Sequence, residues 1–323
     1  MKKMLALTAL CSIVILLLLT PSCNNSSSDK PVASGKEDSL KKVLDRGEYL
    51  ANHVAACLDC HSTRDISKFA GPVVVGTEGQ GGFEFGPGVG VPGKVYAKNI
   101  TPDNETGIGT WTDDEILRAM THGINKAGDT LFPIMPYARY NHMAKSDLLA
   151  IVAYIRTLKP IKNKIPARQL MIPIAMAYPA PALQASVDAN VLPAETNKVA
   201  YGAYLGNMAH CTDCHTPLTP QGAPDMTKLF AGGHLFDLGT FKVVASNITS
   251  DSLTGIGAWT EERFLNKFLP LREEKNYNFN PGKENTVMPL PAMAGMTDSD
   301  LKAIYAWVKT IPAVTNKIEK YPK

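Results

Sequence analysis

The chain has 323 residues, of which 33 are basic, 30 are acidic and 45% are hydrophobic, and its formal net charge is +3. This length accommodates two domains of ordinary size, and the near-neutral charge lacks the basic footprint of a nucleic-acid-binding protein. Four of the six cysteines stand in one short motif that occurs twice, and the other two lie in or next to the leader, so no spare pair is left outside the motifs for a structural disulfide.

The first 22 residues predict an export signal. Lys2 and Lys3 precede an apolar run from Met4 to Leu19, and three short residues follow before Cys23, as in the charged, hydrophobic and cleavage regions of such a signal. The run is short for a membrane span. We therefore expect residues 1–22 to be removed and the protein to be exported to the periplasmic or cell-surface side of a bacterial membrane.

A polar stretch, 23–36, follows the leader and predicts a flexible tether. Cys23 at its start resembles the acylated cysteine of a bacterial lipoprotein, which would hold the protein at a membrane surface. Thr20 and Pro21 depart from the usual lipoprotein signal. An uncleaved N-terminal helix and a fully soluble exported protein stay open as alternatives to the lipid anchor.

A Cys-x-x-Cys-His motif is the main signal of this sequence. Apolar residues at helical spacing from Leu40 to Val54 predict a helix that leads to Cys57-Leu58-Asp59-Cys60-His61, and the motif returns as Cys211-Thr212-Asp213-Cys214-His215. In this spacing two thiols can add to the vinyl groups of one porphyrin while the adjacent imidazole reaches its iron, which is the c-type haem attachment pattern. The two copies predict two covalently bound haem c groups.

Zinc binding and dithiol chemistry are the alternatives to haem attachment. Four thiolates could bind one zinc ion, and either pair could act as a redox dithiol or a disulfide, since both kinds of site favour Cys-x-x-Cys. Neither kind needs a histidine directly after the second cysteine, and both copies of the motif have one. Haem attachment is therefore the preferred interpretation.

Local signals predict the rest of the first half. Residues 69–95 are rich in Gly with short β-branched runs, so we expect a long loop with a minor hairpin; the sequence assigns no role to its Gly-rich stretch 71–93. The segment from Thr112 to Glu115 has the form of a capping box, which predicts a helix to about Gly123. Apolar residues at helical spacing from 148 to 158 predict the helix that ends this half.

A proline-rich segment joins the two halves. Residues 160–197 contain six prolines and an apolar centre around Ile172, a stiff composition unlike that of a Gly/Ser tether. We expect this segment to pack along both halves and to fix the separation of the two haems.

The second half repeats the first at a period of about 150 residues. Residues 202–205 match 47–50, residues 247–260 match 99–112, and apolar residues from Leu301 to Ile311 predict a matching terminal helix. The cap at Thr260 is retained without the reciprocal Glu. We therefore expect an all-α fold of two tandem domains, 37–159 and 198–323, joined by segment 160–197.

Taken together, the haem motif, the Thr-Gly-Ile-Gly-x-Trp element, the downstream Met-Pro and the last helix resemble class I cytochrome c, twice over, across about residues 37–315. The whole chain is similar to di-haem cytochromes c that accept electrons from periplasmic dehydrogenases. The resemblance implies that each pair of cysteines attaches one haem and that the histidine after it is the proximal iron ligand. The implied haem-binding residues are Cys57, Cys60 and His61 for the first haem, and Cys211, Cys214 and His215 for the second.

The resemblance also assigns two kinds of supporting residue. Trp111 and Trp259 stand where the family's tryptophan hydrogen-bonds a haem propionate, with an ordinary core position as the alternative. The first and last helices of each half are expected to cross where a glycine faces an aromatic ring. The expected pairs are Gly47 with Tyr154 and Gly202 with Trp307.

The sixth iron ligand decides the function, because His/Met ligation raises the potential and closes the iron. The resemblance favours Met135 and Met288, which are repeat-matched and each followed by Pro. Three other methionines are the alternatives: Met143, Met296 and Met293. We interpret the five histidines outside the motifs as surface or hydrogen-bonded residues: His53, His122, His142, His210 and His234. Of these, His53 and His210 stand close enough in the sequence to a haem motif to tune the haem potential.

We therefore predict an electron-transfer protein rather than an enzyme. It would carry single electrons between an extracytoplasmic donor, a dehydrogenase, and a respiratory acceptor such as a cytochrome or an oxidase. A di-haem peroxidase is the enzymatic alternative, but it needs one iron that opens for peroxide, and the matched Met-Pro elements favour two closed sites. A fixed cytochrome subunit of a membrane dehydrogenase or oxidase complex is the third possibility.

Overall fold

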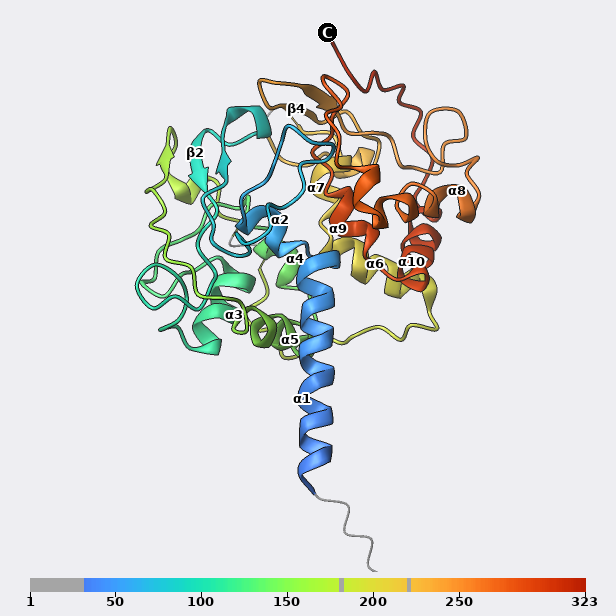
Figure 1. The fold of residues 1–323 in the computed structure, drawn as a ribbon. Helices are drawn as coiled ribbons and strands as arrows, with labels where there is room; N and C mark the ends of the chain where they lie inside the picture. The colour runs from blue at the N-terminus through green and yellow to red at the C-terminus, as the bar shows by residue number, and fades with distance from the viewer. Residues whose placement is uncertain (1–31, 180–182, 220–221) are drawn as a thin grey trace, which may run out of the picture. The chain divides into compact units, whose positions relative to one another are not determined.

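The computed structural model describes residues 32–179, 183–219 and 222–323. The expected leader 1–22, Cys23 and the tether up to residue 31 lie outside the described residues. The chain divides into two compact units, 1–39 and 40–323, and both halves of the repeat belong to the second. Figure 1 shows a mostly helical ribbon with a few short strands, so the all-α prediction is confirmed in part. Within the described ranges, no helix combines the length and the apolar character that crossing a membrane requires.

The first half contains five α-helices and a hairpin. Helix α1 begins at Val32, so residues 32–36 are helical rather than part of a flexible tether, and it continues directly into a π-helical turn, Leu50–Val54. Leu40 and Val43, two of the apolar residues whose spacing predicts this helix, are exposed. The elements of this half are α1 Val32–Tyr49, α2 Cys57–His61, β1 Glu84–Phe85, β2 Gly93–Tyr96, α3 Asp113–His122, α4 Tyr137–Tyr140 and α5 Lys145–Ile155.

The second half repeats this order, and its short helix α9 follows the Met-Pro element as α4 does in the first half. Its elements are α6 Lys198–Met208, α7 Cys211–His215, β4 Leu235–Asp237, β5 Lys242–Val244, α8 Glu261–Leu265, α9 Leu290–Ala294 and α10 Asp298–Val308. The connecting segment contributes β3, Gln169–Leu170. Single 3-10 turns occur at Pro87–Val89, Ile174–Met176, Met226–Lys228, Leu269–Arg272 and Glu274–Asn276.

The strands form two small antiparallel sheets. In the first sheet, β1 pairs with β2 in the register Glu84↔Tyr96, which confirms the predicted minor hairpin. Strand β3 of the connecting segment pairs with the other edge of β2. The second sheet, β4 with β5, was not predicted; its strands close around Gly239, whose φ of 78° is the left-handed conformation that glycine adopts readily. The fold is therefore mostly helical with two minor hairpins.

The predicted helix caps are present. The Thr112 side chain accepts a hydrogen bond from the Glu115 backbone N–H, and the Glu115 carboxylate accepts one from the Thr112 backbone N–H, which completes the capping box of α3. The helix ends at Gly123 with a left-handed φ of 64°. Thr260 caps α8 by accepting from the Arg263 N–H, without the reciprocal Glu. The local sequence signals therefore predict both starts correctly.

The first and last helices of each half cross at a glycine. A Cβ atom at Gly47 would overlap with the backbone carbonyl of Ala150, and one at Gly202 would overlap with that of Ala303. The ring of Trp307 packs against Gly206, one turn after Gly202. The predicted pairing of Gly202 with Trp307 is thus wrong in one detail, because the glycine that makes room for the ring is Gly206.

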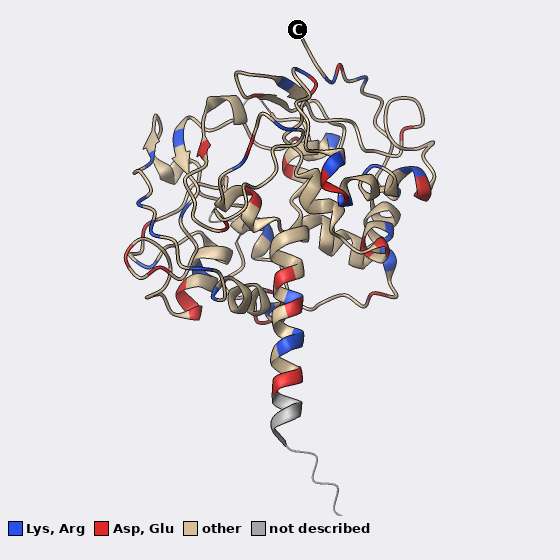
Figure 2. Ribbon diagram, in the orientation of Figure 1, with Lys and Arg blue, Asp and Glu red and all other residues tan. Residues whose placement is uncertain are grey.

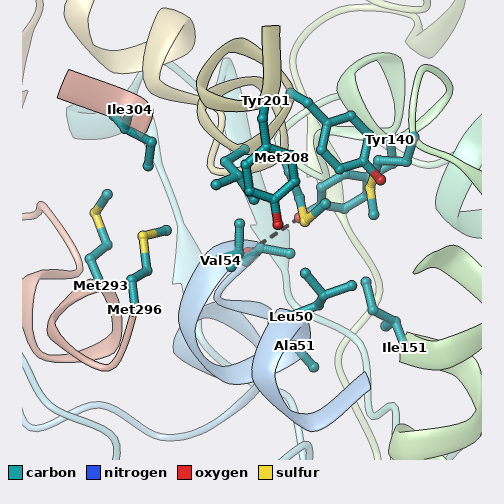
Figure 3. Packing of buried hydrophobic residues seen from close by; sticks show 14 of the residues in the cluster. Leu50, Ala51, Val54, Tyr140, Ile151, Tyr201, Met208, Met293, Met296 and Ile304 are labelled. Carbon is teal, nitrogen blue, oxygen red and sulfur yellow. Dashed lines mark hydrogen bonds between the residues drawn. The ribbon is translucent and has the colours of Figure 1, made fainter. Parts of the chain in front are cut away.

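The two halves share one hydrophobic core. The main buried cluster includes Leu50, Val54 and Ile151 of the first half together with Met208 and Ile304 of the second. Figure 3 shows side chains of both halves in this cluster. Burying apolar surface between the halves favours their association, so they form one body rather than two domains on a tether.

Two tyrosines make reciprocal hydrogen bonds between the halves. Tyr49, in α1, donates to Asp300 Oδ2 at 2.5 Å, and its repeat-matched counterpart Tyr204, in α6, donates to Asp147 Oδ2 at 2.8 Å. Each hydroxyl also accepts a backbone N–H of the opposite half, from Thr297 and Ala144 respectively. The halves are therefore joined by an approximately symmetric exchange of the same two contacts.

The connecting segment packs along the first half. Asn163 donates its backbone N–H to Thr106 Oγ1 at 2.9 Å and its side-chain Nδ2 to Gln80 O at 3.0 Å. Asn316, near the end of the second half, makes the matching hydrogen bonds to Thr254 and Ala231. The start of the segment therefore completes the first half by hydrogen bonds that residues 314–318 repeat in the second.

Figure 2 shows basic and acidic residues interspersed along the ribbon. Many of them form exposed ion pairs, such as Lys41 with Asp45 and Lys145 with Asp188. Exposed pairs of this kind contribute little to stability. The charge distribution agrees with the near-neutral composition.

Candidate haem sites

Each Cys-x-x-Cys-His motif forms a short helix that begins after a left-handed residue. Ala56 precedes α2 with φ 48°, and His210 precedes α7 with φ 43°. Residues other than glycine rarely adopt this backbone conformation, and its strain is tolerated only where the surrounding structure requires it. Both halves use the same sharp turn to direct the chain from the preceding helix into the motif.

The two motif histidines have the same orienting hydrogen bond. His61 Nδ1 lies 2.6 Å from Lys98 O, and His215 Nδ1 lies 2.8 Å from Ser246 O. A carbonyl oxygen only accepts, so each Nδ1 carries the proton and each Nε2 is left as the atom that can bind a metal. Burial lowers the pKa of both imidazoles below the ordinary value, against a smaller opposing effect of the carbonyl. Both rings are therefore neutral, which is the form that ligates iron.

The backbone behind each histidine is also repeated. Gly81 donates to His61 O and Gly232 donates to His215 O, each at 2.7 Å. Two buried asparagines, Asn99 and Asn247, are also equivalent: the side chain of each donates to the hydroxyl of a threonine seven residues later in the sequence. The scaffold around the two histidines is thus the same in both halves.

A cavity of about 670 Å³ lies against the first motif. Cys57, Cys60, His61, Trp111 and Met135 all line it, so the structure brings the predicted residues of the first half together. Its volume falls in the range of small-molecule and cofactor sites. Six of its apolar lining residues come from the loop after β2 and from α3 and α5: Ile100, Ile108, Ile116, Met120, Ile151 and Ile155.

Four cations and one acid also line this cavity. Lys162 is paired with Glu105, with 2.6 Å between Nζ and Oε2. The remaining three lining cations are Lys98, Lys164 and Arg168. A haem has an apolar ring and two carboxylates, so an apolar cavity with excess positive charge fits it chemically. The basic run in 159–168 was the available signal for these residues, which the sequence analysis did not single out.

The methionines occupy two kinds of position. Met135 lines the cavity, whereas Met143 is 2% exposed and belongs to the hydrophobic core. In the second half, Met288 is partly buried at the edge of the core, whereas Met293 and Met296 are inside it (Figure 3). The repeat-matched Met-Pro methionines are therefore the accessible ones, and the alternatives act as core residues.

The second motif is divided between two apolar clusters. Cys211, Trp259 and Met288 pack against the main core, and Cys214 packs against a smaller cluster of Phe236, Phe241 and Val243. Two cations lie over the Trp259 ring, the guanidinium of Arg263 at 4.6 Å and the Lys267 ammonium at 5.2 Å from its centroid. Trp259 thus differs from its counterpart Trp111, which lines the first cavity.

The four motif cysteines are free thiols in buried surroundings. Burial raises the pKa of Cys57, Cys211 and Cys214 to about 12 each and that of Cys60 to about 11. Such thiols stay protonated at neutral pH, whereas a redox dithiol uses the thiolate. Over the residues that the structure describes, there is no group of three or more His, Cys, Asp or Glu that could hold a metal ion.

Four of the other histidines are hydrogen-bonded as predicted. His53 contacts Ala292 O at 3.0 Å, His234 contacts Asp213 O at 3.3 Å, and both His122 and His142 bond to Gln184. His210 was predicted to lie near a haem edge of its own half. The structure places it in the wall of the first cavity, so this histidine of the second half lines the site of the first.

The family model of cytochrome c matches residues 199–312. These residues are a cytochrome c domain. Cytochromes c carry electrons and are not catalytic enzymes, and this describes the family that residues 199–312 match.

Curated relatives extend the similarity to most of the chain. The cytochrome c subunit of alcohol dehydrogenase (quinone) from Gluconobacter oxydans is 29% identical over 87% of this chain and 57% of the relative. The gluconate 2-dehydrogenase cytochrome c subunit from Pantoea cypripedii is 30% identical over 84% of this chain and 60% of the relative. The chain thus spans about three fifths of the length of these relatives.

A third relative is matched by this chain over nearly the full length of the relative. The diheme cytochrome c-type protein of Cereibacter sphaeroides is 29% identical over 88% of this chain and 92% of the relative. The Cys-x-x-Cys-His motif inside the matched residues 199–312 and the other copy at 57–61 are together consistent with two haems.

Proposed function

We propose that the protein is a di-haem cytochrome c that passes single electrons between a dehydrogenase and a respiratory acceptor outside the cytoplasm. The observation that carries this proposal is the first-half cavity, because one apolar space is lined by Cys57, Cys60, His61 and Met135 together. The haem iron supplies the one-electron redox chemistry, and the chain supplies its attachment, its axial ligands and its environment.

Each half contributes an equivalent set of residues to this task. Cys57 and Cys60 would attach the first haem, and His61 and Met135 would bind its iron. In the second half, Cys211 and Cys214 would attach the haem, and His215 and Met288 would bind its iron. A His/Met pair raises the reduction potential and leaves no coordination position for oxygen or peroxide. The matched hydrogen bonds of the two histidines support two equivalent sites.

The lining of the first cavity insulates the haem and neutralises its carboxylates. The isoleucines would exclude water from the bound haem, which would raise its potential by destabilising the ferric charge. Lys98, Lys164 and Arg168 are the cations that would face the propionates, together with the indole N–H of Trp111. Trp259 has the corresponding role in the second half, among the cations of Arg263 and Lys267.

A dehydrogenase is the proposed electron donor, since two of the relatives are named as cytochrome c subunits of dehydrogenases. The export signal at 1–22 and acylation of Cys23 would place the protein on the outer side of a bacterial membrane. A permanent dehydrogenase subunit is the second candidate function, and the word subunit in those names favours it. Co-purification of a dehydrogenase from membranes in mild detergent supports the fixed subunit, and recovery of the cytochrome alone supports the free carrier.

A redox titration of the holoprotein, followed by its haem spectrum, tests the ligand assignment. Met135→Ala should lower the potential of one haem and leave the other nearly unchanged, and Met288→Ala should do the reverse. Met143→Ala is the matched control, because this buried methionine packs in the core rather than in the cavity. If the haem potential fell in Met143→Ala but not in Met135→Ala, the ligand assignment would be wrong. Rapid turnover of peroxide would show that one iron has an open coordination position and that the protein is not a simple electron carrier.

A further inference from the structure

Each proposed methionine ligand lies beside a contact with the opposite half. The first ligand loop, residues 131–141, contains Met135 and α4; the second ligand loop, residues 285–294, contains Met288 and α9. We infer that each half positions the ligand loop of the other, through Arg139–Asp213 for the first loop and through Asn285 for the second. This inference rests on the proposed ligation by Met135 and Met288.

The first ligand loop is held by an ion pair with the second haem motif. Arg139, one turn after Met135, donates to Asp213 Oδ1 from Nη2 at 2.6 Å and from Nε at 3.1 Å. Asp213 stands between Cys211 and Cys214. The side chains are 27% and 37% exposed, so the pair is partly protected from solvent. A guanidinium that bonds through two nitrogens also fixes an orientation.

His210 extends the same contact into the first cavity. It lies one residue before Cys211 and lines the cavity together with Met135. The second motif therefore contacts the first half at two points: Asp213 pairs with Arg139 of the ligand loop, and His210 lines the cavity. A displacement of α7 is thereby transmitted to the loop that carries Met135.

The second ligand loop is held by a buried amide. The Asn285 side chain is buried, and it donates to Ile66 O and Lys68 O, each at 3.1 Å, while its Oδ1 accepts from the Ala70 N–H at 2.8 Å. All three partners are backbone groups of the first half. A buried amide with this many partners leaves several polar groups unsatisfied when it is removed, so the contact strongly determines the loop position.

Two further contacts support the second ligand loop. The Phe69 and Phe279 rings stack with centroids 5.5 Å apart, and the Phe69 N–H donates to Phe279 O at 2.9 Å. On the other side of Met288, His53 Nδ1 contacts Ala292 O in α9 at 3.0 Å. The loop of the second half is thus fixed to the first half both before and after the methionine.

These contacts predict that a change in one half alters the haem of the other. An iron–thioether bond is weak and depends on a well-positioned loop, so a looser loop lets the methionine leave the iron and lowers the potential. Asp213→Asn, in the second motif, should therefore weaken Met135 ligation of the first haem. Asn285→Ala should weaken Met288 ligation by releasing the second loop from the first half.

The test measures the methionine–iron(III) charge-transfer absorbance and the two potentials of the holoprotein, together with amide hydrogen exchange. Asn285→Ala should remove this absorbance from one of the two haems and speed exchange in 285–294 by at least about tenfold. Tyr204→Phe is the matched control, because it removes a hydrogen bond between the halves outside both ligand loops. The control should leave the absorbance of both haems unchanged.

Combined variants assign the effect to one haem. Asn285→Ala should have no further spectral effect in a Met288→Ala background and its full effect in a Met135→Ala background. If Met288→Ala itself changes neither haem, the ligand assignment fails; if it changes one and Asn285→Ala changes none, the inference fails. Asp213→Asn, which preserves side-chain shape, gives the same test for the first loop should Asn285→Ala not fold.

Discussion

Tyr49→Phe tests the contact between the halves most sharply, because it removes one hydroxyl and little else. The Tyr49 hydroxyl donates to Asp300 Oδ2 at 2.5 Å and accepts the Thr297 N–H at 3.1 Å. Asp300 is 6% exposed. In the described part of the chain no Lys, Arg or His forms an ion pair with it, so the tyrosine is its main stabilising partner.

The expected loss of stability follows from that dependence. A hydrogen bond to a charged group contributes roughly 1.5–3 kcal/mol to stability, and leaving the carboxylate buried without its donor places Tyr49→Phe toward the upper end of this range. Tyr204→Phe removes the repeat-matched bond, but Asp147 retains two hydrogen bonds from Arg46, at 3.0 and 2.8 Å. We expect that variant to lose only about 1 kcal/mol.

Guanidinium chloride unfolding of the two holoproteins, followed by circular dichroism, measures both losses. Tyr49→Phe should lower the midpoint more than Tyr204→Phe, with the slope of the transition unchanged. Equal losses, or a larger loss for Tyr204→Phe, would show that Asp300 does not depend on Tyr49 and that the halves are held together by other contacts.

Three further predictions concern local features of the fold. Gly47→Ala should destabilise the protein by about 3 kcal/mol, because its Cβ would overlap with the Ala150 carbonyl; a loss below about 1 kcal/mol in chemical unfolding would contradict the helix crossing. Thr112→Ala should lose about 1 kcal/mol by removing the α3 cap, and an unchanged thermal midpoint would contradict it. Burial lowers the pKa of His234 below the unfolded 6.5 despite the opposing effect of Asp213, so the unfolded chain binds the extra proton and stability falls as the pH drops below about 6.5. His234→Gln should flatten this fall in a pH series of unfolding curves, and an unaltered slope would contradict the assignment.

The features that the sequence predicts correctly are those with short-range signals. The capping box of Thr112 and Glu115 is complete within four residues, and the helix end at Gly123 follows from one left-handed glycine. The repeat predicts the second half from the first, because equal residues at equal spacing form equal hydrogen bonds, as at His61 and His215.

The features that the sequence does not predict depend on partners far apart in the chain. A tyrosine and an aspartate are common residues in helices, so nothing in the sequence around Tyr49 or Asp300 predicts the hydrogen bond between them. That contact becomes evident only when the two halves are packed together. The same holds for Asn285, which bonds to a loop more than two hundred residues away. His210 is adjacent to its own motif, yet it lines the other half's cavity, because the contact between the halves decides what lies next to α7.

Peptide mass spectrometry of the exported holoprotein tests the central claim most directly. Our account predicts one added tetrapyrrole on the peptide that contains Cys57 and Cys60, and a second on the peptide that contains Cys211 and Cys214. A tetrapyrrole on only one of these peptides, or on neither, would contradict it.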